Sequence, residues 1–532
     1  RQSAEAKMKV NSLCPSDYDE SLGKLSRLSR KSTLSAWDEG IAVINFILKP
    51  GSSTNDTLSD SQKEALAKVK DILLEGSEDQ TKHIPADLFA NHKRTKHIGN
   101  EKTSICPTNS YLLNQFAGVN TESPRKKWKR AINVLRFINR MKIEGRKRTI
   151  YRRPSHGSGS FILPEWTMLA PDIQARVARL LSWDSLSKWD FDIFEMEKLT
   201  DGKALLFVGW ALLSSPHAQY AMAKQLLAQG ESNLSLPLFD NMQGYRFIEM
   251  FHIPQMTLCN FLRVIMGDYN NENFYHNSTH AADVLQSVHS IITKIDRNQY
   301  IVADLEIFSV LLAAAIHDVG HQGRNNNFHV NKRTKLALRY NDTSVLENMH
   351  VASAFSRIMG DDRDSNLDIF EYMQPEQVTA CRRQIIGAVL HTDMSKHFSD
   401  ISKMKGLLMK KEHRDSDAIY GGWEVFPFFL HMADISNQAK HLPIAHQWTD
   451  RCLEEFFEQG DEEKKLGLPV SPLCCRLKTD TAESQVGFIT YVVQPAYEVL
   501  GMMVPRVKEE INPNIEFNLS YWEEVQSKNE KN

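Results

Sequence analysis

Histidine and aspartate side chains follow apolar stretches at several points in the second half of this 532-residue chain. The stretch "YHNSTHAADV" (275–284) places His276 and His280 four residues apart. On a helix, side chains at this spacing point from one face toward a common volume. Such a pair can bind a metal ion or transfer protons, but histidine pairs are also common on surfaces and in cores. The motif alone therefore leaves its chemistry open.

Two later stretches also end in residues that can bind a metal. His317 and Asp318 follow the apolar run of "LLAAAIHDVGHQG", and Asp434 follows that of "FFLHMADISNQAK". Taken singly, His317 fits a hydrogen-bonded core histidine and Asp434 a helix cap. A buried carboxylate is costly, however, unless a cation compensates its charge. Three apolar helices that carry such groups inward are better explained by one shared metal site.

The combined ligand set indicates which metals would bind and what they would do. His280, His317, Asp318 and Asp434 offer the nitrogen and oxygen donors that suit Zn²⁺. The second oxygen of Asp318 can bridge to a harder ion that keeps its waters, as Mg²⁺ does, with Mn²⁺ as an alternative. Two metals about 3.5–4 Å apart hold a hydroxide and clamp a phosphoryl group. Because His276 stands beside this set, it could protonate the departing oxygen, so the residues predict hydrolysis of a phosphate ester.

Gln485 and Phe488 form a second pattern of interest. Three residues apart on a helix, an amide and an aromatic ring can face one pocket. The alternative is a surface glutamine above a core phenylalanine.

Composition limits the class of protein. The chain is 42% hydrophobic and 24% charged, with a net charge of −2, so nothing indicates a nucleic-acid partner. No apolar run approaches the ~20 residues that cross a bilayer. Its seven cysteines are scattered and lack CxxC spacing, which is typical of a reducing compartment. We therefore expect a cytoplasmic protein. Since the chain begins at Arg1, a missing upstream segment that associates with a membrane is left open.

Composition also predicts how the chain is divided. Residues 1–122 are polar and serine-rich, which favours a largely disordered region with one short helix at 61–75 that packs on another part. Residues 123–153 read as a basic amphipathic helix, and 154–164 as a linker. Apolar residues then recur at helical spacing, so we expect residues 165–527 to form one large all-α domain.

The basic helix has three interpretations. Its apolar stripe consists of bulky residues flanked by many Lys and Arg side chains: Trp128, Ile132, Leu135 and Met141. This pattern suits the acidic, methionine-rich groove of calmodulin, which would bind residues 124–148. The same face could lie on an anionic membrane, or dock on the protein with its charges solvated.

At this point the sequence resembles a known family, the metal-dependent class I 3′,5′-cyclic-nucleotide phosphodiesterases of the His-Asp metal hydrolase group. The similarity covers roughly residues 183–525. It is carried by motifs that occur in order: "WDFDIF", "YHNSTHAADV", "AAAIHDVGHQG", "YNDTSVLENMH", "HTDMSKHF", "HMADISNQAK", "WTDRCLEEFFEQGD" and "SQVGFITYVV".

The resemblance implies an all-α catalytic domain with a deep pocket over a zinc and a magnesium ion. By motif position, the resemblance implies four metal ligands, with Asp318 shared by both ions: His280, His317, Asp318 and Asp434. His276 corresponds to the general acid that protonates O3′, and Glu455 to the carboxylate that orients it. The positions that organise the second metal's waters are His321, Glu347, His350 and Thr392.

The resemblance also implies how a nucleotide binds. Gln485 is similar to the glutamine that bonds the purine edge, and Phe488 to the ring that stacks on its face. Cys452 stands where relatives usually have a branched aliphatic residue against the base. Asn437 resembles the asparagine common in cAMP-selective members, and Tyr275 completes the predicted set. Because an amide can present either edge, Gln485 alone does not choose adenine or guanine. We expect cAMP as the substrate, with dual use of cAMP and cGMP as the alternative.

Two other functions compete with this one. The first is a His-Asp hydrolase of another nucleotide, which the pair Gln485 and Phe488 argues against. The second is a silent catalytic domain that serves as a calmodulin- or membrane-binding protein, which the complete ligand set argues against. Association into a homodimer is left open.

A peptide of residues 124–148 should bind calcium-loaded calmodulin, because its apolar stripe would enter the groove while its cations meet carboxylates. Calorimetry at micromolar concentration should show heat that disappears when calcium is chelated, and less heat for the Trp128→Ala peptide. Absence of heat, or heat without calcium dependence, would leave only membrane binding or docking on the protein.

Overall fold

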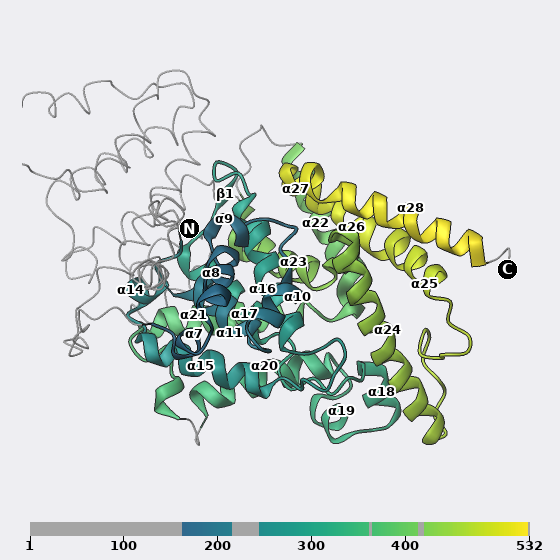
Figure 1. The fold of residues 1–532 in the computed structure, drawn as a ribbon, viewed down its shortest axis with the longest axis horizontal. Coiled ribbons are helices and arrows are strands. Elements are labelled where there is room, and N and C mark those ends of the chain that lie inside the picture. Colours follow the sequence, from purple (N-terminus) through teal and green to yellow (C-terminus); the bar gives the residue numbers. More distant parts are fainter. Residues whose placement is uncertain (1–161, 215–243, 361–363, 413–419, 530–532) are drawn as a thin grey trace, which may run out of the picture. The chain divides into compact units, whose positions relative to one another are not determined.

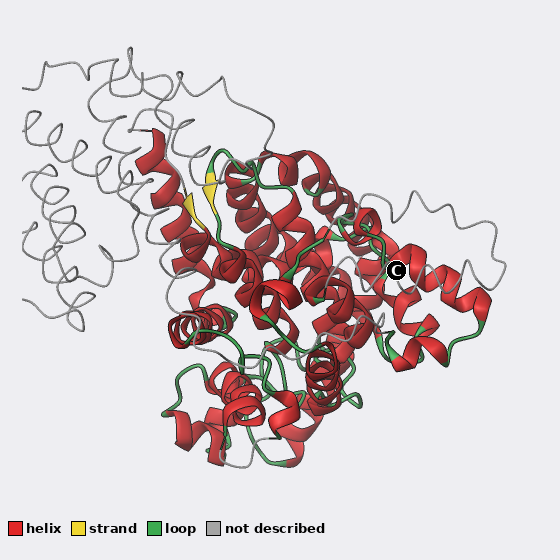
Figure 2. Ribbon diagram, turned by 90° about the vertical axis from the view of Figure 1, so that its left-hand side faces the viewer, coloured by secondary structure: helices red, strands yellow, loops and turns green. Residues whose placement is uncertain are grey.

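Helices make up nearly all of the regular structure in the computed structural model, which describes residues 162–214, 244–360, 364–412 and 420–529 (Figure 1). The strands in these ranges are β1 (Tyr300–Ile301) and β2 (Tyr420–Gly421), which pair in parallel (Figure 2). This confirms the predicted all-α class. The expected helix at 61–75 and the basic helix at 123–153 lie outside the described residues.

The structure describes the last part of the predicted linker, where Leu163 is fully buried and Pro164 begins α7. The helices of the first half are α7 (Pro164–Thr167), α8 (Pro171–Leu180), α9 (Trp183–Leu186), α10 (Ile193–Leu199), α11 (Ala204–Leu213), α14 (Phe247–Phe251), α15 (Gln255–Asp268), α16 (Ser278–Thr293), α17 (Asp304–Ile316), α18 (Asn326–Asn331) and α19 (Lys335–Tyr340).

The second half continues with α20 (Val345–Met359), α21 (Pro375–Leu390), α22 (His397–Glu412), α23 (Gly422–Asp434), α24 (Leu442–Lys465), α25 (Thr481–Phe488), α26 (Gln494–Met503), α27 (Pro505–Glu510) and α28 (Asn512–Asn529). Short 3₁₀ turns are η5 (Ser365–Leu367), η6 (Met394–Lys396) and η7 (Ser436–Ala439), and η8 (Ile489–Val493) is a π-helical turn. None of the described helices is long and apolar enough to cross a membrane.

Helix α16 lies at the centre of the bundle, where every residue from Ser278 to Ile292 is buried. Helices α11, α17 and α23 pack against it (Figure 1). All of α11 is buried as well, together with the stretch of α17 from Ile307 to Ile316. Helices that are apolar on all sides belong in the middle of a large domain. The polar groups that such helices carry are therefore forced into the interior.

The ends of three of these helices define where the polar groups stand. The Asn277 side chain caps α16 by accepting hydrogen bonds from the backbone N–H groups of Thr279 (3.0 Å) and His280 (3.2 Å). Helix α17 ends at Ile316, directly before His317, and α23 ends at Asp434 itself. Helix α16 therefore carries His280 in its first turn, whereas α17 and α23 end at residues that can bind a metal.

Helix α24 needs a glycine where a loop crosses it. A Cβ atom on Gly460 would lie 1.8 Å from the carbonyl oxygen of Cys474, which is a backbone atom that cannot rotate away. The close approach fixes the loop after α24 on the helix that carries Cys452 and Glu455.

Gly460→Ala should therefore lower the free energy of unfolding by about 1–3 kcal/mol or more, because α24 and the loop must move apart. The matched control is Gly406→Ala in α22, where an added Cβ meets nothing within 4 Å. That control should be neutral or stabilise by roughly 0.5–1 kcal/mol, since alanine favours the helix. Urea denaturation followed by circular dichroism compares them, and equal stability of both variants would refute the close contact.

Candidate active site

Four predicted metal ligands converge at the ends of α16, α17 and α23. Their donor atoms, one each from His280, His317, Asp318 and Asp434, all lie within 4.8 Å of one another. Nε2 of His280 is 3.0 Å from Oδ1 of Asp434, and Nε2 of His317 is 3.0 Å from Oδ2 of Asp318. The two Nε2 atoms are 3.3 Å apart. Residues from distant parts of the sequence thus enclose one small volume.

The electrostatics of this volume favour a cation. Burial would raise the pKa of Asp318, but the charge of a protonated His317 holds that pKa well below its ordinary value. The pKa of His317 is raised well above its ordinary value, since Asp318 and Asp434 outweigh the opposing effect of burial. Oδ2 of Asp318 lies 3.0 Å from Nε2 of His317 and 3.5 Å from Nε2 of His280. Two buried carboxylates require positive charge, which either a protonated imidazole or a metal ion can supply.

The orientation of His317 suits a metal ligand. Its Nδ1 lies 2.9 Å from the carbonyl oxygen of Ala314, to which it donates. In the neutral ring this bond keeps the proton on Nδ1, so that the Nε2 lone pair can bind a metal ion held between the imidazole and the carboxylates. A nitrogen and oxygen donor set of this kind can hold a metal ion.

His276 differs from the expectation in one respect. We predicted that it shares a helix face with His280, but α16 begins at Ser278 and His276 precedes the helix. The physical reason is the capping of α16 by Asn277, an asparagine whose side chain is better used at a helix start than inside a helix. Glu455 holds the turn instead, accepting from the backbone N–H groups of Tyr275 and His276 (both 3.0 Å).

His276 and Glu455 also form a direct pair, with Nδ1 and Oε1 2.5 Å apart. Burial alone would lower the pKa of His276. The charge and hydrogen bond of Glu455, helped by Asp318 and Asp434, raise the pKa instead to about 9. Glu455 behaves in the reverse sense, because burial would raise its pKa while His276 lowers it to about 2. His276 is thus held as a cation beside an ionised carboxylate.

His321 stacks on His276, with ring centroids 3.9 Å apart and an interplanar angle of 22°. Burial and the charge of His276 hold the pKa of His321 well below its ordinary value, and its Nδ1 accepts from Gly323 N–H (3.0 Å). His276, His321 and Glu455 therefore also gather three donor atoms. Since stacked rings direct their lone pairs side by side rather than at one point, this group is better suited to holding a proton than a metal.

Of the residues predicted to organise a second metal's waters, His350 contacts Asp318 directly. Nε2 of His350 is 3.5 Å from Oδ1 of Asp318, and its Nδ1 donates to Val319 O (2.8 Å). Glu347 is bonded by Asn326 Nδ2, 3.1 Å from each carboxylate oxygen. Burial and the nearby Asp393 raise the pKa of Glu347 to about 7.

Thr392 is buried and donates its hydroxyl hydrogen to Val389 O (2.9 Å). The hydroxyl oxygen of Thr392 can still accept a hydrogen bond from another group. Neither Thr392 nor Glu347 makes a hydrogen bond to the four converging residues in the described part of the chain.

The predicted nucleotide-binding residues come from three elements. Nδ2 of Asn437, in η7, donates to the hydroxyl of Tyr275 (2.6 Å). Gln485 and Phe488 lie on α25 and are both half-buried, as is Cys452 on α24. The π-helical turn η8 follows Phe488 directly, a feature that often marks functional sites.

Gln485 is held by partners that the sequence did not reveal. Nε1 of Trp522 can only donate, and it donates to Oε1 of Gln438 (3.3 Å). Nε2 of Gln438 therefore faces Thr449 Oγ1 (2.7 Å) and Oε1 of Gln485 (2.8 Å). The Gln485 amide is thus fixed with its Nε2 on the other side, near Ser484 Oγ (3.3 Å).

Sequence reasoning missed Gln438, Asn273 and Tyr269. Gln438 stands in a quoted motif, but no spacing rule links it to Gln485. Asn273 Nδ2 donates to the carbonyl oxygens of His276 and His321 (both 2.9 Å) and so joins the two loops. The hydroxyl of Tyr269 accepts from Asp318 N–H (3.3 Å).

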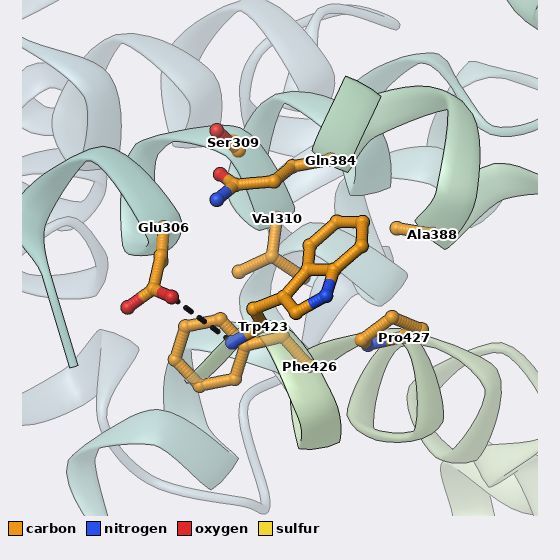
Figure 3. A pocket seen from close by; sticks show the side chains of 8 residues that line it. All are labelled: Glu306, Ser309, Val310, Gln384, Ala388, Trp423, Phe426 and Pro427. Atoms are coloured by element: carbon orange, nitrogen blue, oxygen red, sulfur yellow. Dashed lines mark hydrogen bonds between the residues drawn. The ribbon is translucent and has the colours of Figure 1, made fainter. Parts of the chain in front are cut away.

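A separate hollow lies between α17, α21 and α23 (Figure 3). Its lining is mostly apolar and includes Trp423, Phe426 and Pro427. Glu306 accepts a hydrogen bond from Trp423 N–H (3.1 Å), and Oε1 of Gln384 is buried without a partner. No residue predicted for the active site lines this hollow, and we assign no chemistry to it.

Comparison with known proteins supports the interpretation of the larger cluster. Residues 275–513 match the family described as 3'5'-cyclic nucleotide phosphodiesterase. This part of the chain belongs to that family. The matched segment contains all four converging residues, as well as His276, Glu455 and Gln485.

Curated phosphodiesterases are similar to more than half of the chain. Mouse 3',5'-cyclic-AMP phosphodiesterase 4C is 34% identical over 385 residues, which is 70% of this chain and 50% of the relative. Human dual specificity calcium/calmodulin-dependent 3',5'-cyclic nucleotide phosphodiesterase 1C is 37% identical over 323 residues, covering 60% and 40%. The chain thus spans about half the length of the curated relatives it matches.

Solved structures of phosphodiesterase domains share the fold. The phosphodiesterase domain of the RhoPDE fusion protein from the choanoflagellate Salpingoeca rosetta has a TM-score of 0.53 and 27% identity, covering 67% of this chain and 100% of that one. LmjPDEB1 in complex with IBMX has a TM-score of 0.52 at 23% identity, covering 68% and 98%. The second likeness shows the fold alone.

Glu455→Gln should lower the pKa of His276 from about 9 by roughly 1–3 pH units, because the ion pair is lost while burial remains. NMR titration of the imidazole measures it. The control is Glu454→Gln, since Glu454 pairs with Arg476 on the exposed side of α24 and should leave the titration unchanged. An unchanged pKa in Glu455→Gln would refute the assigned cause.

Proposed function

We propose that this chain hydrolyses 3′,5′-cyclic nucleotides to 5′-monophosphates and so terminates cyclic-nucleotide signalling. The observation that carries the proposal is the convergence of four metal-binding side chains beside the His276–Glu455 pair. Membership of the phosphodiesterase family agrees with it. A metal site alone could bind the phosphate but could not protonate the leaving oxygen. An acid alone could not neutralise the charge of the phosphate.

His280, His317, Asp318 and Asp434 would hold Zn²⁺, which suits their nitrogen and oxygen donors. The other oxygen of Asp318 faces His350 and would share a second ion, Mg²⁺ or Mn²⁺, held otherwise through water. The chemistry of the four donor atoms, which all lie within 4.8 Å of one another, supports this ligand set. When bound, the two ions supply a hydroxide nucleophile at neutral pH and neutralise the phosphate's charge.

His276 would protonate O3′ as the cyclic ester opens. Its raised pKa keeps the proton on the ring at neutral pH, and Glu455 fixes Nδ1 so that Nε2 points away from the carboxylate. Because the pKa of Glu455 is held low, it stays ionised and stabilises the imidazolium rather than taking part as an acid. The neutral, stacked His321 limits the freedom of the His276 ring.

The fixed Gln485 amide bears on the choice of nucleotide. Adenine and guanine present opposite patterns of donors and acceptors, so an amide that cannot rotate should favour one of them. Phe488 would stack on the base, with Asn437, Tyr275 and Cys452 completing the pocket. We propose cAMP as the preferred substrate, on the likeness of Asn437 to the asparagine common in cAMP-selective members. Dual use is the alternative, and one of the similar relatives is named a dual specificity enzyme.

Regulation by calmodulin is a further part of the proposal. Several relatives are named calcium/calmodulin-dependent, and the basic segment 124–148 has the residue pattern of a calmodulin target. That segment lies outside the described residues. Binding to an anionic membrane and formation of a homodimer stay predictions of the sequence.

Purified protein supplied with Mg²⁺ should convert cAMP to 5′-AMP faster than it converts cGMP. The His276→Ala variant should lose about 10²–10⁴-fold in turnover while its bound metals remain, because only proton transfer is removed. Steady-state kinetics and elemental analysis test both. Absence of turnover of either nucleotide, in folded protein with metal bound, would contradict the function. Hydrolysis of other nucleotides in a substrate panel would favour the alternative.

A further inference from the structure

The short segment from Asp434 to Lys440 connects the metal site to the nucleotide pocket. It begins with a converging carboxylate, contains Asn437 and Gln438, and ends at Lys440. Asn437 contacts Tyr275, and Gln438 holds the amide of Gln485. A shift of this segment would therefore disturb both sites at once.

Lys440 is anchored in the interior on the central helix. Its side chain is fully buried, and Nζ donates to Oδ1 of Asp283 (2.9 Å) and to Oγ of Ser287 (2.6 Å). The same ammonium group lies 4.6 Å from the centre of the Trp189 ring. Two hydrogen bonds and an aromatic face thus surround the charge.

The partners of Lys440 stand on the helix that carries His280. Asp283 follows His280 by three residues on α16, and Ser287 follows one turn later. Because a buried helix is rigid, the ion pair sets the distance between the α16 side of the metal site and the segment that begins at Asp434.

The backbone of the segment is held at the same point from other elements. Trp189 Nε1 donates to the carbonyl oxygen of Ala439 (2.7 Å). Asn518, on α28, donates to the carbonyl oxygens of Gln438 (2.8 Å) and Lys440 (2.9 Å). These three hydrogen bonds fix the backbone at the end of η7, and the Lys440–Asp283 ion pair adds a charged contact at the same point.

Stability alone does not account for a pair this deeply buried. Replacing both members of a buried ion pair by apolar residues is often neutral or stabilising, whereas removing one member leaves an uncompensated charge. A pair with little net stabilising effect can still determine which arrangement a segment adopts.

We propose that Asp283 and Lys440 are positioning residues that hold the segment 434–440 in register against α16. In this role they keep Asp434 beside the other three side chains that would hold the metal, and keep Gln438 on Gln485. The part that concerns the nucleotide rests on the proposed function, while the part that concerns the metal does not.

The test is the double variant Asp283→Val with Lys440→Met, which removes both charges. It should remain folded by circular dichroism yet bind divalent metal about 10–100-fold more weakly in a chelator competition. Its ratio of kcat/KM for cAMP over cGMP should fall at least about tenfold toward 1, because Gln485 is released.

The matched control is Lys294→Met with Glu510→Gln. Lys294 is likewise buried at the end of α16 and bonds a serine hydroxyl and a carboxylate, but these partners, Ser290 and Glu510, lie outside 434–440. This control should keep wild-type metal affinity and selectivity. Ser287→Ala removes one hydrogen bond to Lys440. It should lower the metal affinity and the cAMP/cGMP selectivity by smaller factors than the double variant does.

Wild-type metal affinity in the folded double variant overturns the positioning role, as does loss of metal in the control. If the double variant does not fold, the Ser287→Ala variant decides. Wild-type metal affinity and nucleotide selectivity in that variant would also overturn the positioning role. If wild-type protein hydrolyses neither nucleotide, the proposed function fails, but the metal competition still decides whether the pair positions the site.

Discussion

Two carboxylates buried at the meeting point of three apolar helices are the constraint on which this structure depends. Asp318 and Asp434 cannot stay ionised in the interior without positive charge close by. The imidazoles of His280 and His317 supply lone pairs rather than charge unless they are protonated. A metal ion satisfies all four at once, since it offers the charge that the carboxylates need and accepts the lone pairs of the imidazoles.

The rest of the domain follows from placing that cluster. Helices α16, α17 and α23 are buried over most of their length, so the packing that buries them also carries their polar residues inward. Glu455 then serves two purposes from a fourth helix, α24. It holds the turn before α16 through two backbone N–H groups, and it pairs with the ring of His276. Glu455 thus both positions His276 and makes the largest contribution to raising its pKa.

Much of this could be predicted from the sequence because the main signals are local. An apolar run that ends in His-Asp, or in Asp before a polar break, is visible without a structure, and the all-α class follows from helical spacing. The position of His276 was not visible, because a four-residue spacing fits a helix equally well until the capping role of Asn277 is recognised. The contact from Trp522 to Gln438, 84 residues apart, depends on how α28 packs, which no local pattern encodes.

The central claim is that His280, His317, Asp318 and Asp434 bind one metal ion together. Anomalous diffraction measured on both sides of the zinc absorption edge, from crystals of protein purified without added metal, tests it directly. The account predicts one peak within about 2.0–2.2 Å of Nε2 of both histidines and of an oxygen of each aspartate. Density that places the imidazole nitrogens at hydrogen-bond distance from the carboxylate oxygens, with no anomalous peak between them in folded protein, would contradict it.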